Sequence, residues 1–230
     1  MEFYLSISNE IVPNELIPRF HSTGWLTGYV LFIAFISLAV ARFARAGIYE
    51  TVLVANTKFQ GVVSFVKETM PLGKPSSLLL LFNYMLSTGV ICYLYVQSNQ
   101  SIQLSNDAIV FLLPVALLIW NLSCFVLTRW LSGATGVFGG PITFKVIGAQ
   151  VVGLIDFLLA ILWLFVSGQG TLFAQLALVL FFTESAFRVV KSVNLVLKQG
   201  VSWYYIILYF CTLEIMPLLM IYIVLTRHIY

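Results

Sequence analysis

Long apolar runs are the feature that most constrains how this chain can fold. A helix needs about 20 mostly apolar residues to cross the hydrocarbon core of a bilayer. Six stretches meet or approach that length, at residues 24–41, 78–96, 108–128, 146–166, 172–190 and 201–225. Continuous runs of this kind argue against a membrane β-barrel, whose strands alternate apolar and polar residues. The pattern predicts an all-α fold, a polytopic membrane bundle of about six transmembrane helices in which residues 1–230 form one domain.

Composition agrees with this class. Hydrophobic residues make up 60% of the 230 residues and charged residues 9%, whereas an ordinary soluble domain carries about 25% charged residues. The net charge of +3 does not indicate a nucleic-acid partner, because the cations line one membrane surface instead of clustering in a groove. The chain is therefore expected to have the lipid bilayer as its surroundings.

The distribution of Lys and Arg predicts the orientation, because cytoplasmic flanks carry their excess. With the N-terminus outside, only Arg19 and Arg227 of the 12 Lys and Arg lie outside, and the other ten face the cytoplasm. Both termini are therefore expected to be extracytoplasmic, with residues 1–23 as an extracytoplasmic segment. This segment lacks the basic start of a cleavable signal and contains Pro13 and Pro18, so we expect the first span to act as an anchor.

The longest connection, residues 42–77, predicts an amphipathic helix lying in the cytoplasmic interface. Pro71 and Pro75 are expected to end it before the second span. It is either a connector resting on the bilayer, which we favour, or a contact for a partner or anionic lipid. The apolar positions that recur at helical spacing are Ile48, Val52, Phe59, Val62, Val63 and Val66.

Neither a metal nor a cofactor is expected. The three cysteines fall within apolar spans and show no metal-ligand spacing. The only histidines, His21 and His228, lie at the outer ends of the first and last spans. The glycine-rich stretch 133–141 lacks the GK[ST] ending of a phosphate-binding loop and is expected to be a turn.

Three carboxylates lie inside otherwise apolar runs: Asp156, Glu184 and Glu214. Each costs roughly 2.5 to 3.5 kcal/mol on insertion scales, so each is expected to face the bundle interior and to find a partner. The helical rise places Asp156 about 16 Å and Glu214 about 20 Å into a hydrocarbon core of about 30 Å. Pro217 should kink the last span beside Glu214.

A buried polar site is therefore predicted from Asp156, Glu214, Asn121 and Gln150. If the two carboxylates face one another, at least one should hold a proton, as in other carboxylate pairs that share a site. The alternative is that these groups only join helices through hydrogen bonds, which is common in membrane bundles.

A second candidate site follows one stripe of the fifth span. Glu184, Arg188 and Lys191 fall at i, i+4 and i+7, and Lys198 continues the face. The acid precedes the base, which is the favourable order on a helix. The stripe is either an ion pair that reaches to the interface or a contact for a cytoplasmic partner or an anionic headgroup. Both interpretations remain open at this point.

The C-terminal run FRVVKSVNLVLKQGVSWYYIILYFCTLEIMPLLMIYIVL carries a resemblance. It resembles an uncharacterised integral-membrane family of Bacteroidota, domain of unknown function 4271, whose members end in a basic helix followed by an LYLC-x-LEI-x-PL pattern. The resemblance implies a bacterial inner-membrane location and a multi-span bundle, and it supplies no activity. The matching residues are Phe187, Arg188, Lys191, Ser192, Leu208, Tyr209, Cys211, Leu213, Glu214, Ile215, Pro217 and Leu218.

The function expected from these observations is a non-enzymatic accessory or partner-binding subunit of a membrane complex, with other membrane proteins as partners. The alternative is a small proton-coupled transporter that uses Asp156 and Glu214. Against transport, the outer halves of the fourth and sixth spans are almost entirely apolar and offer no exit. An intramembrane enzyme is the weakest class, because a serine protease would need a Ser/His pair at depth.

Overall fold

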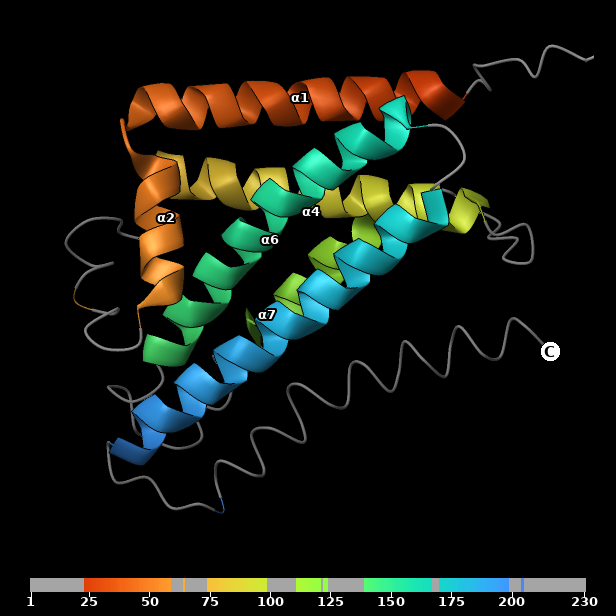
Figure 1. Ribbon diagram of the computed structural model, residues 1–230. Coiled ribbons are helices and arrows are strands. Elements are labelled where there is room, and N and C mark those ends of the chain that lie inside the picture. The colour runs from red at the N-terminus through yellow and green to blue at the C-terminus, as the bar shows by residue number, and fades with distance from the viewer. Residues whose placement is uncertain are drawn as a thin grey trace, which may run out of the picture.

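The computed structural model describes residues 23–58, 64, 74–98, 111–120, 122–123, 139–166, 170–198 and 204. These residues are helical apart from short turns, and no strand occurs among them, which confirms the all-α class. The helices are α1 (Thr23–Ala44), α2 (Ile48–Thr57), α4 (Pro75–Ser98), α6 (Gly139–Phe165), α7 (Gly170–Lys198) and a shorter apolar helix, Phe111–Trp120 (Figure 1).

Four of these helices are long and apolar enough to cross a membrane, which indicates a membrane protein. The stretches concerned are Trp25–Ala44, Pro75–Gln97, Gly140–Phe165 and Leu172–Leu195. The predicted span 108–128 is represented by Phe111–Trp120, and the predicted span 201–225 lies outside the described residues apart from Tyr204. The count of six spans therefore stays a prediction.

Helices α4 and α6 form the centre of the described bundle. Half of the apolar window of α4 and 67% of that of α6 are buried, compared with 33% for α1 and 22% for α7. Figure 1 shows α4 and α6 running in the same direction, while α1 and α7 run in the opposite direction. The helix Phe111–Trp120 runs antiparallel to α4, because Phe111 stacks on Tyr93 and Leu118 packs near Tyr84.

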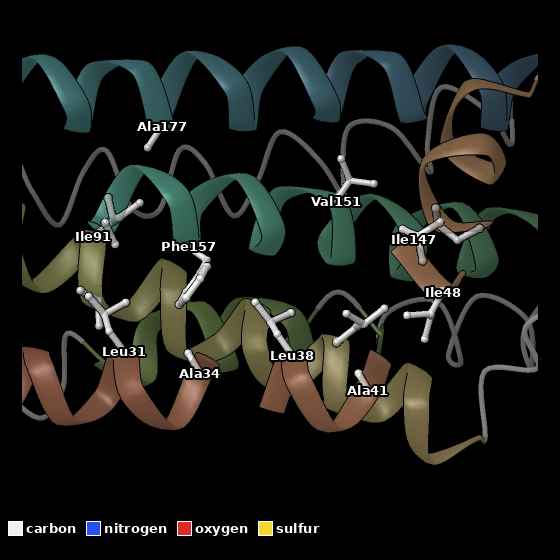
Figure 2. Close-up of a cluster of buried hydrophobic side chains, with 14 of the residues drawn as sticks. Leu31, Ala34, Leu38, Ala41, Ile48, Ile91, Ile147, Val151, Phe157 and Ala177 are labelled. Atoms are coloured by element: carbon white, nitrogen blue, oxygen red, sulfur yellow. The ribbon is translucent and has the colours of Figure 1, made fainter. Parts of the chain in front are cut away.

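Apolar side chains of α1 line one side of the core. They recur three and four residues apart, as one face of a helix requires, and Figure 2 shows them directed at α4 and α6. The opposite face of α1 exposes large apolar side chains, including Trp25 and Phe43, as a lipid-facing helix would. The inward residues of α1 are Leu31, Ala34, Leu38 and Ala41.

A glycine brings the two central helices together. A Cβ atom placed on Gly153 of α6 would lie 2.6 Å from the Cα atom of Tyr84 on α4. Any larger residue would therefore collide with the backbone of α4. Small residues at helix contacts are the usual means by which membrane helices approach closely.

Helix α2 lies across the end of the bundle where α4 and α6 begin (Figure 1). Gly47 precedes it with a φ of 79°, a left-handed conformation that glycine adopts without steric cost. Ile48 and Val52 are fully buried in the core, and the hydroxyl of Tyr49 donates to the carbonyl oxygen of Leu38 at 2.6 Å.

This placement differs from a helix whose apolar face rests on lipid. The apolar face of α2 is covered by the bundle, because Ile48, Val52 and Ala55 all lie in the same core cluster as α1 and α6 residues. The other apolar positions of the predicted interfacial helix, Phe59, Val62, Val63 and Val66, lie outside the described residues.

Candidate functional site

Polar side chains join α4 to α6 along their contact. Gln150 donates from Nε2 to the hydroxyl of Ser77 at 2.8 Å and to its carbonyl oxygen at 3.1 Å. Asn83 donates from Nδ2 to the carbonyl oxygen of Gly153 at 3.1 Å. Thr88 donates from Oγ1 to Oδ2 of Asp156 at 2.7 Å. We call this set the polar seam: Ser77, Asn83, Ser87 and Thr88 of α4 with Gln150, Gly153 and Asp156 of α6.

The seam lies inside the bundle and reaches its middle. Ser77, Asn83, Ser87 and Gln150 are fully buried and Asp156 is 2% exposed. The α6 residues of the seam stand three positions apart, which is about 4.5 Å of helical rise per step. Ser77 lies in the first turn of α4, whereas Thr88 lies near its centre. The seam therefore starts at the end covered by α2 and stops at Asp156.

Two oxygens of the seam lack a donor within the described residues: Oε1 of Gln150 and Oδ1 of Asp156. Ser87 donates to Oδ1 of Asn83 at 3.3 Å, so that amide oxygen is satisfied. Buried polar atoms without a partner are uncommon in native proteins, and each calls for an explanation such as an internal water or a ligand. These two oxygens are where the seam can bind something further.

The other predicted members of the buried site are not placed. Asn121 and Glu214 lie outside the described residues. The coupling of Asp156 to Glu214 therefore stays a prediction. Sequence reasoning identified Asp156 and Gln150 but missed Thr88 and Ser77, their partners on α4.

A second polar group lies where α2 meets α7, at the end of the bundle. Asn56 of α2 donates from Nδ2 to Oε2 of Glu184 at 3.1 Å, and its carbonyl oxygen accepts a hydrogen bond from Nζ of Lys191. The ammonium of Lys191 also lies 4.3 Å from the centroid of the Phe187 ring, within the range of a cation–π contact. We call this set the basic cluster: Asn56 of α2 with Glu184, Arg188 and Lys191 of α7.

The cations of this cluster face inward. Arg188 and Lys191 are 9% and 3% exposed. The stripe that was predicted to reach the interface or dock a partner is therefore turned towards α6 and α2, and of its members only Lys198 is exposed. Arg188 donates from Nε to the backbone oxygen of Glu184 at 3.3 Å. Oε1 of Glu184 has no hydrogen-bond donor within the described residues.

Gly148 of α6 makes room for this arrangement. A Cβ atom at that position would lie 2.4 Å from Cδ of Arg188 and 2.8 Å from Oε1 of Glu184. The α7 side chains thus lie directly over the α6 backbone. Sequence reasoning missed Gly148 and Asn56, although a glycine within an apolar span is a recognised sign of a helix contact.

The described residues contain no group of three His, Cys, Asp or Glu side chains close enough to hold a metal ion. Cys92 is a free thiol on α4.

Comparison with known proteins identifies a family without an assigned activity. Neither the curated proteins nor the solved structures contain a match to this chain. One family model matches residues 27–225, which include α4, α6 and α7 in full and α1 from Thr27 onward. The resemblance seen at the C-terminal run is thereby confirmed, and the chain belongs to the family described as domain of unknown function (DUF4271).

Proposed function

We propose that this protein is a non-enzymatic accessory subunit of a bacterial inner-membrane complex, and that it binds its partner through the outward face of α2. The observation that supports this is that α2 is fixed to the bundle with one face buried and the other exposed. Its inward residues are buried, while Glu50, Leu53 and Thr57 are exposed. These three lie at i, i+3 and i+7, on one face of the helix.

The fixed position of α2 favours a binding surface over a simple connector. A connector needs no fixed position, yet α2 is held at one end through Tyr49 and at the other through Asn56, which contacts α7. A surface that is already ordered loses less conformational entropy when a partner binds. The outward face also mixes an acid, a large apolar residue and a hydroxyl, which suits a protein partner better than anionic lipid.

The test is site-specific crosslinking in cells. A photoreactive residue at Leu53 or Thr57 is expected to give one protein adduct of defined mass, and Glu50→Lys should weaken it. The control is the same residue at Leu176, an apolar position on α7 that is 43% exposed and should meet lipid. Equal adduct patterns at Leu53 and Leu176, or none at either α2 position, would contradict the proposal.

The second candidate is a small proton-coupled transporter, and Asp156 is the observation in its favour. Its carboxyl lies near the middle of α6, and one oxygen has no donor within the described residues. In reconstituted vesicles, Asp156→Asn should abolish any pH-driven flux while the protein stays folded. We rank this function second because α6 beyond Asp156 is apolar, with Phe157 and Ala160 buried.

A further inference from the structure

We infer that Asp156 binds and releases a proton, and that it exchanges this proton with only one side of the membrane, the side where α4 and α6 begin. The inference concerns the same carboxyl as the transporter candidate. It requires proton binding but no passage across the bilayer.

The polar seam supplies the route. Ser76 and Ser77 are buried in the first turn of α4, and the hydroxyl of Ser77 bonds to Gln150. From there the polar groups continue inward through Asn83 and Ser87, which bond to each other. Hydroxyl and amide groups both donate and accept hydrogen bonds, so such a series can relay protons together with water.

The two oxygens without a donor stand at opposite ends of this route. Oε1 of Gln150 and Oδ1 of Asp156 belong to residues six positions apart on α6, about 9 Å along the helix. Buried polar groups of this kind are commonly satisfied by internal water, which typically makes about three hydrogen bonds. Water at both places would connect the α2 end of the bundle with the carboxyl.

Among the described residues, polar groups become sparse beyond Asp156. The next buried residues of α6 are Phe157 and Ala160. Past Thr88, α4 continues with buried Val90, Ile91 and Tyr93, and the ring of Tyr93 stacks on Phe111. From Phe157 to Phe165 the α6 side chains are hydrocarbon except for the indole of Trp163. Within the described residues, this stretch of α6 offers no series of donors and acceptors that leads to the opposite side.

Thr88 sets which oxygen takes the proton. Its hydroxyl donates to Oδ2 of Asp156, so Oδ1 remains for the exchanged proton. Among the described residues, the titratable side chains that interact electrostatically with Asp156 are Tyr84 and Cys92, both on α4. Arg188 of α7 acts on Tyr84, while α1 and the helix Phe111–Trp120 present apolar residues such as Leu31 and Leu118 to the core.

Infrared difference spectroscopy on oriented vesicles tests the inference. The full chain is reconstituted, sorted to one orientation, and exposed to a pH step on one side at a time. The carbonyl band of a protonated carboxyl should appear and disappear when the pH changes on the side of the α4 N-terminus. It should not respond to the opposite side, and Asp156→Asn should remove it.

A variant in the seam tests the route separately. Asn83→Leu should slow the response by roughly tenfold, which corresponds to about 1.4 kcal/mol in the barrier, and Gln150→Leu replaces it if that protein does not fold. Leu158→Met, at a 59% exposed position of α6, should leave the rate unchanged. Thr88→Val should shift the frequency of the band, and Thr88→Ser should restore it.

The outcomes separate the two ideas about Asp156. A band that follows the opposite side, or both sides equally, would overturn one-sided access, and so would a normal rate in the folded seam variant. Absence of any band that depends on Asp156 would overturn proton binding itself. A one-sided band without flux would refute the transporter and leave this inference standing.

Discussion

The polar seam and the basic cluster place buried polar side chains on the same helix, α6, in different ways. The seam has hydroxyl, amide and backbone groups around a single carboxyl. The cluster gathers two cations and one carboxylate where α2 meets α7, over the backbone of α6. Gly148, over which Arg188 and Glu184 of the cluster lie, precedes Asp156 of the seam by eight positions, about 12 Å of helical rise.

The depth of each region in the bundle explains why their polar partners differ. Near the end of a bundle, a cation can use a helix-terminal carbonyl and an aromatic ring, as Lys191 does with Asn56 and Phe187. Further in, an ionisable residue costs more, and the partners within reach are neutral side chains that the neighbouring helix supplies. The two regions should therefore respond differently to substitution.

The largest effect is expected at Gly153, where α6 touches the backbone of α4. Gly153→Ala should lower the free energy of unfolding by about 3 kcal/mol, because a Cβ would lie 2.6 Å and 2.7 Å from Tyr84 atoms and overpacking has costs of this order. Gly148→Ala should cost less, since it meets the side chains of Arg188 and Glu184, which can move. Thermal unfolding in detergent measures both.

The matched control is Gly28→Ala, because nothing lies within 4 Å of a Cβ at that position. It should leave the stability close to that of the wild type. If Gly153→Ala were as stable as Gly28→Ala, the close approach of α4 and α6 would not exist.

The second-largest loss of stability is expected from a substitution in the basic cluster. Lys191→Met removes the hydrogen bond to Asn56 and the contact with Phe187, and should destabilise the protein by about 2 kcal/mol, the usual size for a hydrogen bond to a charged group. Lys198→Met changes an exposed lysine near the end of the same helix and should have little effect. Equal unfolding temperatures for these two variants would show that Lys191 is not held as described.

A smaller loss of stability is expected from a substitution in the polar seam. Gln150→Leu removes two hydrogen bonds to Ser77 but also removes an amide oxygen that lacks a donor within the described residues. Measured membrane hydrogen bonds average about 0.6 kcal/mol, so a loss of about 1 kcal/mol is expected. Steric trapping in bicelles resolves differences of this size, and a loss as large as that of Lys191→Met would remove the contrast between the two regions.

The smallest change in stability concerns the hydroxyl of Tyr49, which forms a hydrogen bond between α2 and α1. Burial raises the pKa of Tyr49 above its ordinary value of 10.0, although the nearby Arg42 guanidinium opposes this. The folded state therefore holds the phenol proton more tightly, so this contribution to stability is present below pH 10 and is lost as the pH rises through the folded pKa. Unfolding measured against pH in the alkaline range should be flatter for Tyr49→Phe, and an unchanged curve would contradict the prediction.

The long helices could be predicted from the sequence, because hydropathy alone identifies segments able to cross a membrane. Their ends were predicted only in part. The predicted window 146–166 misses the start of α6 at Gly139, since backbone hydrogen bonds continue past the first charged residue while an apolar window stops there. The end of α7 at Lys198 agrees with the prediction, because the charged stripe that continues to Lys198 indicated a helix longer than the apolar window 172–190.

The candidate sites were predictable only in part. The burial of Asp156 followed from the cost of a carboxylate in an apolar span, but its partner Thr88 lies 68 positions away in a run that carries no charge. The stripe of Arg188 and Lys191 showed that these residues share a face of the helix. It did not show which neighbour covers that face, because Asn56 is 135 positions from Lys191.

The parallel packing of α4 and α6 also has a consequence for biosynthesis. Parallel neighbours need a return segment, and residues 99–138 separate these two helices. The partners of Asn83 and Thr88 on α6 follow 70 and 68 positions later, so at typical rates of about 5 to 20 residues per second they leave the ribosome roughly 3 to 14 s after α4. During that interval Asn83 and Thr88 lack their α6 partners, so α4 should stay close to the insertion machinery, and the bundle should assemble around it only after α6 arrives.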